Sequence, residues 1–140
     1  MSVMKRIIIS GVPLRIEVAT RPFDYFKGLS GRKILENIDG MLFRFPFKWK
    51  WRMSMRGMNF PLDFIWIREG IIVEITQNMV TGFVSPRGRI DAVIEIPSGH
   101  ITDKISWHGR SIIIETDIGK GDRYGQYDNR SGTPKSLVLF

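Results

Sequence analysis

Short runs rich in Ile and Val recur along the chain, and each is bounded by Gly, Pro, Ser or Asn. β-branched side chains pack well on pleated surfaces and lose rotamer freedom in helices. The chain has 20 Ile and 8 Val against 2 Ala and 7 Leu, so strand is favoured over helix. The pattern predicts a mostly β protein with strands at 5–9, 14–19, 62–67, 71–77, 90–96 and 111–115.

Turn and helix signals complete this outline. Ser10-Gly11 can reverse the chain after the first strand, and Arg68-Glu69-Gly70 forms a three-residue hairpin loop in which the glycine can be left-handed. Two stretches favour short helices. Residues 22–28 begin with a proline, a favoured first helical residue, and residues 98–105 carry Ile at helical spacing.

The C-terminal segment differs from the rest of the chain. From Gly119 onward it contains almost no aliphatic residue until the apolar stretch 137–140. We therefore expect a single β-rich domain over residues 1–118 and a flexible or loosely docked tail over 119–140. The last four residues could still pair with a sheet edge or pack on a partner molecule.

The most unusual pattern runs from Phe43 to Arg56, where large apolar and basic residues alternate. In an extended chain, alternate side chains point to opposite faces. Two interpretations are open: a basic ribbon backed by aromatics, suited to phosphates, anionic sugars or single-stranded nucleic acid, or a half-buried strand or lid whose wet face is basic. Pro46 argues against one continuous central strand. The cations of this stretch are Arg44, Lys48, Lys50, Arg52 and Arg56.

Charge and composition narrow the classes of protein. The net charge of +7 comes entirely from residues 1–60, which carry 12 basic and 4 acidic side chains, whereas residues 61–140 carry 9 and 10. The absence of Cys excludes disulfides and thiolate metal sites. No apolar run approaches the roughly 20 residues of a spanning helix, and no signal peptide is visible, so we expect a cytoplasmic protein. Two Gln and no Cys agree with a thermophilic source.

Several blocks together resemble the ordered signature of a widespread prokaryotic family, domain of unknown function 192. They are Gly28-Leu29 with Arg32, then Gly40-Met41-Leu42-Phe43-Arg44-Phe45, then residues 53–63 ending in Pro61-Leu62-Asp63, and finally Glu95-Ile96-Pro97-Ser98-Gly99. The resemblance spans about Arg15 to Glu115. It implies a single compact antiparallel β-sandwich or barrel-like domain with one or two short helices, and it implies no activity.

The chain departs from the family pattern in three places. Gly109-Arg110 stands where the family usually has Gly-Asp, so any role of that acid is lost here. Gly57 stands where many members have Asn, and Ser54 occupies a position often held by an aromatic residue.

Asp63 and Glu95 are the acids of the family-like blocks. One interpretation is a structural clamp, in which Arg32 or Arg56 pairs with a carboxylate and holds the loops together. The sharper alternative is a carboxylate pair that lines a cleft for acid/base work or sugar binding. Strand alternation places Asp63 opposite to Leu62 and Phe64, but the sequence does not place the two acids near each other.

Other chemistry has little support. His100 and Asp103 share a helix face at i and i+3, but two ligands make a weak metal signal and we expect no metal and no cofactor. No serine lies in a nucleophile elbow, no phosphate loop is present, and the methionines fit adaptable packing better than soft-metal ligation. No catalytic residue is assigned, and an enzyme is the less favoured class.

Three hypotheses follow for function. The first is a module that binds a small polar or anionic ligand, such as a carbohydrate or nucleotide, in a basic, aromatic-lined groove. The second is nucleic-acid binding by the basic N-terminal half. The third is an enzyme that uses Asp63 and Glu95. No membrane partner is expected, and the sequence does not show the oligomeric state. The candidate ligand-binding residues are Arg32, Met41, Phe43, Arg44, Met55, Arg56, Asp63 and Glu95, with Lys48, Lys50 and Arg52 as a basic rim.

Overall fold

Strands make up most of the described chain. The computed structural model describes residues 3–19, 37–100, 105–115 and 137–139. Within these residues the chain forms ten strands and one 3-10 turn. They are β1 (Val3–Ile9), β2 (Val12–Ala19), β3 (Gly40–Trp49), β4 (Met53–Ser54), β5 (Leu62–Arg68), β6 (Ile71–Met79), β7 (Phe83–Val84), β8 (Ile90–Pro97), η1 (Ile105–Trp107), β9 (Ile112–Glu115) and β10 (Leu137–Leu139).

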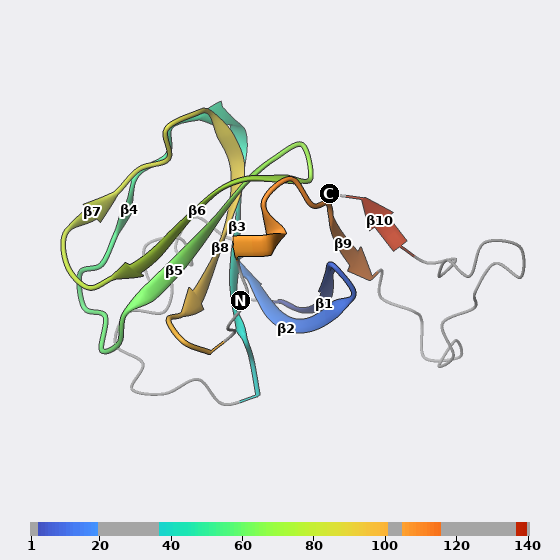
Figure 1. The fold of residues 1–140 in the computed structure, drawn as a ribbon, viewed down its shortest axis with the longest axis horizontal. Coiled ribbons are helices and arrows are strands. Elements are labelled where there is room, and N and C mark those ends of the chain that lie inside the picture. Colours follow the sequence, from blue (N-terminus) through green and yellow to red (C-terminus); the bar gives the residue numbers. More distant parts are fainter. Residues whose placement is uncertain (1–2, 20–36, 101–104, 116–136, 140) are drawn as a thin grey trace, which may run out of the picture.

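Eight strands form one curled sheet in the order β10-β9-β1-β2-β3-β8-β5-β6, and β4 pairs with β7 in a separate two-stranded sheet (Figure 1). All neighbours are antiparallel except β2 and β3, which are parallel. The sheet curls until the start of β6 meets the start of β9: Ile71 bridges to Ser111, and Ile72 N donates to Arg110 O at 2.9 Å. One end is therefore closed like a barrel.

Two apolar clusters lie on the two faces of this sheet. The inner cluster includes Ile65, Ile67 and Ile94, and the outer cluster includes Phe64 and Trp66 from the same strand β5. Residues of β4 and β7 belong to the outer cluster, so the small sheet covers part of that face. The central strands β5 and β8 are consequently buried on both faces, which explains their continuous apolar runs.

The fold class and the strands expected from sequence are confirmed: the domain is mostly β and barrel-like. Each of the six predicted strands is present; five of them extend beyond the prediction by one or two residues at one end, and β9 begins one residue later than predicted. The helix predicted at 22–28 lies outside the described residues. The helix predicted at 98–105 does not begin as expected, because Gly99 has a left-handed φ of +82°. Ile105, the last residue of the predicted helix, is the first residue of the 3-10 turn η1. No helix in the described ranges is long and apolar enough to cross a membrane.

Left-handed residues form the turns. Ser10 and Gly11 have φ values of 51° and 79° and join β1 to β2, as predicted. The β5–β6 turn is one residue shorter than predicted, because Arg68 still pairs with Ile71 and only Glu69 and Gly70 turn, with φ values of 51° and 78°. Gly57 has a φ of 76°, a conformation that Gly and Asn tolerate better than other residues. This accounts for Gly where family members often have Asn.

Candidate functional site

The alternating stretch 43–56 does not form one continuous strand with an apolar face and a basic face. β3 pairs with β8 from Met41 to Arg44, and the register then shifts before Trp49. Side chains on the paired part are buried, as at Phe43, whereas Phe47 and Trp49 beyond it are 58% and 54% exposed. The aromatic face is therefore buried at its start and open at its end, where the regular β3–β8 register is interrupted between Arg44 and Trp49.

Beyond the sheet, residues 49–54 and 83–90 run antiparallel to each other. They are joined by the pairs Trp49 with Ile90 and Met53 with Val84. We call these two segments the arm; it contains β4 and β7 and lies at the left of Figure 1. Met53 and Val84 face the outer cluster, which fixes the arm to the sheet.

Aromatic rings gather where β3 leaves the sheet. Phe45 stacks on Trp51 with ring centroids 4.8 Å apart and planes inclined by 11°. Phe47 lies 4.9 Å from the same indole at 51°, and the indole N–H of Trp51 donates to Phe47 O at 2.9 Å. Trp51 thus fixes the chain in this shape while the Phe47 ring stays open to solvent.

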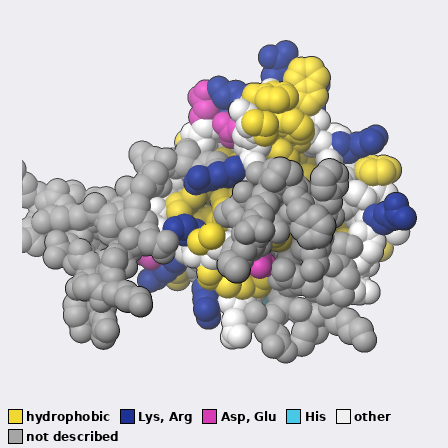
Figure 2. Space-filling model, turned by 180° about the vertical axis from the view of Figure 1, so that it is seen from behind, with side chains coloured by type: hydrophobic (Ala, Val, Ile, Leu, Met, Phe, Trp, Pro, Cys, Tyr) yellow, Lys and Arg dark blue, Asp and Glu magenta, His cyan; other side chains and the backbone are white. Residues whose placement is uncertain are grey.

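Cations lie against the exposed rings of the arm. The Arg52 guanidinium sits 4.2 Å from the centroid of Phe83, which is 62% exposed, and that of Arg89 sits 5.8 Å from Trp49. Both distances fall within the range of cation–π attraction. We call the exposed rings Phe47, Trp49 and Phe83, with Lys50, Arg52 and Arg89, the aromatic-basic surface. Figure 2 shows hydrophobic side chains projecting at the top of the molecule with Lys and Arg side chains around them.

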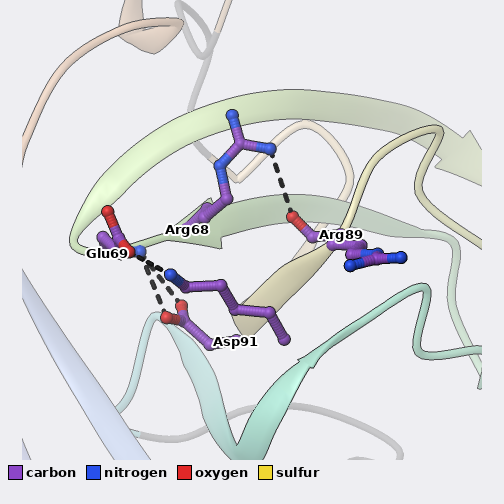
Figure 3. A network of polar contacts seen from close by, with 5 residues as sticks. Arg68, Glu69, Arg89 and Asp91 are labelled. Atoms are coloured by element: carbon purple, nitrogen blue, oxygen red, sulfur yellow. Dashed lines mark hydrogen bonds and ion pairs between the residues drawn. The ribbon is translucent and has the colours of Figure 1, made fainter.

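A polar network anchors the base of the arm to the β5–β6 turn (Figure 3). The backbone N–H of Glu69 donates to both carboxylate oxygens of Asp91 at 3.2 Å, and Arg68 Nη1 donates to Arg89 O at 3.4 Å. Lys48 Nζ donates to Glu69 Oε1, and this hydrogen bond, with the charge of Lys48, lowers the pKa of Glu69. These hydrogen bonds hold the backbone of Arg89 next to the β5–β6 turn.

Asp63 and Glu95 are both buried, with 2% and 4% exposure, but they point to opposite faces of the sheet. In the β5–β8 register, Asp63 pairs with Ile96, and Phe64 pairs with Glu95. Residues paired across antiparallel strands share a face and successive residues alternate. The two acids therefore do not form the carboxylate pair that the third sequence hypothesis required.

Asp63 holds the ends of two neighbouring segments together. Its Oδ1 accepts hydrogen bonds from the backbone N–H of Asn78 at 2.8 Å and from the hydroxyl of Ser98 at 2.7 Å. Asn78 lies where the β5–β6 register shifts and has a φ of 59°, so its N–H has left the regular ladder. The carboxylate replaces the missing acceptor and so acts as a structural clamp.

Glu95 faces the outer cluster between Met41 and Phe64. No described residue donates a hydrogen bond to its carboxyl group. Burial raises the pKa of Glu95 to about 8, because the charged form would lose its hydration there. Glu95 is therefore protonated at neutral pH.

The remaining predicted site residues divide between core and surface. Met41, Phe43 and Met55 are 2%, 1% and 4% exposed and pack in the outer cluster. The exposed members of the predicted set are Arg44, Lys48, Lys50, Arg52 and Arg56. Arg32 and Asp103 lie outside the described residues.

His100, the other metal candidate, has its Nε2 2.7 Å from Asp39 Oδ1. The described ranges contain no group of three His, Cys, Asp or Glu placed to hold a metal ion.

Sequence reasoning missed Phe83 and Arg89. Neither belongs to the alternating stretch, and they reach it only because the arm pairs residues 83–90 with 49–54.

Comparison with known proteins agrees with this architecture. The model of the domain of unknown function 192 family, described as an uncharacterized ACR, matches residues 5–112. The chain belongs to this family. A search of curated proteins finds no match.

Two solved structures share the fold of this family member. A Sinorhizobium meliloti 1021 protein, described as a candidate transcription regulator, has a TM-score of 0.70 and 25% identity, over 79% of this chain and 93% of its own. A Novosphingobium aromaticivorans DSM 12444 protein of unknown function has a TM-score of 0.65 and 23% identity, over 79% and 84%.

Proposed function

We propose that the aromatic-basic surface binds single-stranded nucleic acid. The observation that carries this proposal is the exposure of three large rings, Phe47, Trp49 and Phe83, each more than half open to solvent and set among cations. Proteins that bind single strands combine aromatic rings, on which unpaired bases stack, with basic groups along the backbone path. Bases in a duplex are already stacked, so the rings favour a single strand.

Two further facts support the proposal. The net charge of +7 favours polyanions, and residues 1–60, which include Lys50 and Arg52, carry the whole excess. The Sinorhizobium protein with the same fold is described as a candidate transcription regulator, a role that involves nucleic acid.

Fluorescence anisotropy with a labelled oligo-dT strand tests the proposal. Each phosphate contact on a single strand contributes a slope of about −0.7 to log affinity against log salt concentration, so contacts from Lys50, Arg52 and Arg89 predict a slope of about −2. Arg52→Gln should reduce the slope by about 0.7. Trp49→Ala should weaken binding by about 5- to 150-fold, because stacking contributes roughly 1–3 kcal/mol per base.

Matched controls separate this surface from general charge. Arg6→Gln removes the same charge from β1, and Val80→Ala truncates a side chain that is 64% exposed but has no aromatic ring. Both should bind like the wild type. The proposal is refuted if the wild type shows no binding at low salt, or if Arg6→Gln weakens binding as much as Arg52→Gln does.

A small polar or anionic ligand, such as a carbohydrate, is the second candidate for the same surface. Its specific support is the pair Phe47 and Trp49, because exposed rings of this kind also pack against sugar faces. Strand length distinguishes the two candidates. If affinity rises as the strand is lengthened from one nucleotide to about eight, the result supports binding of a nucleic-acid strand. If a single nucleotide or sugar binds as tightly as the longer strand, the result supports the small ligand.

A further inference from the structure

A cavity lies between the arm and β6. It has a volume of about 710 Å³ and opens between β6 and residues 84–90 of the arm, and His108 lies at its edge. Its volume is within the range of about 300–1,000 Å³ that is typical of small-ligand pockets. Val73, Ile75 and Ile90 supply apolar wall, and Arg68, Thr76 and Arg87 supply polar groups.

The polar groups of this cavity are donors. Arg68 uses Nη1 for Arg89 O, which leaves the rest of its guanidinium for a ligand. The Thr76 hydroxyl accepts the indole N–H of Trp66 at 3.0 Å, so its own O–H remains to donate. The Arg87 side chain is 97% exposed and reaches Glu74 only at 3.8 Å through Nε.

One acid, Glu74, also lines the cavity. Both of its carboxylate oxygens accept the backbone N–H of Arg87 at 3.1 Å, which places residues 84–88 beside β6. Glu74 keeps its negative charge, but Arg68 and Arg87 outnumber it, so the charged side chains of the lining are net positive. His108 Nε2 must donate to the carbonyl oxygen of Val73 at 3.0 Å, because a carbonyl only accepts; the ring is thereby held at the edge.

We propose that this cavity binds a small organic phosphate of about the size of a nucleoside monophosphate. The phosphate group lies between the guanidinium groups of Arg68 and Arg87, whose planar forks match its oxygens. The Thr76 hydroxyl donates to the same group, and the flat apolar part of the ligand packs against the half-buried side chains of Val73 and Ile75. This site is separate from the aromatic-basic surface and does not depend on the function proposed for it.

Isothermal titration calorimetry of the 140-residue chain tests the proposal, with AMP, adenosine and inorganic phosphate as probes. AMP should bind more tightly than either of its parts. Arg68→Gln and Arg87→Gln should each weaken AMP binding by about tenfold or more, which is the usual scale for a lost charge-assisted hydrogen bond. Arg68→Lys keeps the positive charge but loses the planar fork, so its affinity for AMP should lie between those of the wild type and Arg68→Gln. Because Arg87 is almost fully exposed, its variant tests binding even if a change at Arg68 disturbs folding.

Two control variants show whether the heat of AMP binding comes from the cavity. Arg6→Gln has the same charge change in β1, and Trp49→Ala removes a ring of the aromatic-basic surface that does not line the cavity; both should bind AMP normally. The proposal is overturned if AMP gives no heat at millimolar concentration, if Arg6→Gln weakens it equally, or if Trp49→Ala abolishes it. The last result would place AMP on the aromatic-basic surface. A wild-type protein that binds AMP but no oligonucleotide would instead refute only the function proposed for the aromatic-basic surface.

Discussion

Replacing Glu95 by Gln should change how stability depends on pH. The carboxyl is buried beside Met41 and Phe64, and burial raises its pKa from 4.5 to about 8. Between these two pH values the folded protein keeps a proton that the unfolded chain releases. Stability from this group is therefore complete below about pH 4.5 and is lost as the pH rises towards 8.

The magnitude follows from the shift. One pH unit corresponds to about 1.4 kcal/mol, so the wild type should lose about 5 kcal/mol in total across this window. This is a large part of the 5–15 kcal/mol that is typical of whole domains. Gln has nearly the shape of the protonated acid and does not titrate, so the Glu95→Gln variant should lack this loss. The additional N–H of Gln can change the unfolding free energy by a constant amount at every pH, but it does not change how this free energy varies with pH.

Urea unfolding followed by tryptophan fluorescence at pH 5, 6, 7 and 8 measures the effect. The difference in unfolding free energy between variant and wild type should rise by roughly 1 kcal/mol per pH unit in favour of the variant. Glu69→Gln is the control, because the pKa of this exposed acid is lowered and its contribution changes below pH 4.5. Parallel pH curves for wild type and Glu95→Gln would refute the reasoning and show that the folded protein compensates the charge.

Two further predictions concern stability at fixed pH. Asp63→Ala removes a buried acceptor that two donors share and should cost about 1–3 kcal/mol, measured by urea unfolding, whereas Asp63→Asn keeps one acceptor and should cost less. Gly40→Ala would place a Cβ 2.2 Å from Glu95 O and should cost about 1–3 kcal/mol, lowering Tm, whereas Gly88→Ala meets only an arginine end at 3.7 Å and should leave Tm nearly unchanged. Equal Tm values for these two glycine variants would contradict the close approach of β3 to β8.

The strands were predictable because local chemistry decides them. Ile- and Val-rich runs ended by turn residues mark β1, β2, β5, β6, β8 and β9 without knowledge of their partners. Turn length was less predictable. Glu69 adopts a positive φ together with Gly70, and non-glycine residues rarely do so, which made a two-residue turn look unfavourable from sequence.

The candidate surface was only partly predictable, because strand alternation assigns faces only while a neighbouring strand continues. Arg44 is the last residue of the regular β3–β8 pairing, and the rule that holds for Phe43 fails for Phe47. Pro46 marks the change in the sequence. Nothing local marks Phe83 or Arg89, since their place beside Trp49 and Arg52 depends on long-range pairing.

The register between β5 and β8 determines the environment of each of the two buried acids. Phe64 stands opposite Glu95; a shift of one residue would have set Asp63 there and put both carboxyls on one face. With the observed register, each acid meets a different environment. Asp63 remains near polar groups and accepts their hydrogen bonds, whereas Glu95 enters an apolar cluster and keeps its proton. Neither is therefore placed to share acid/base work with the other, and the charges available to a ligand are those of the arm and of β5–β6, where Arg52, Arg68 and Arg89 reach solvent.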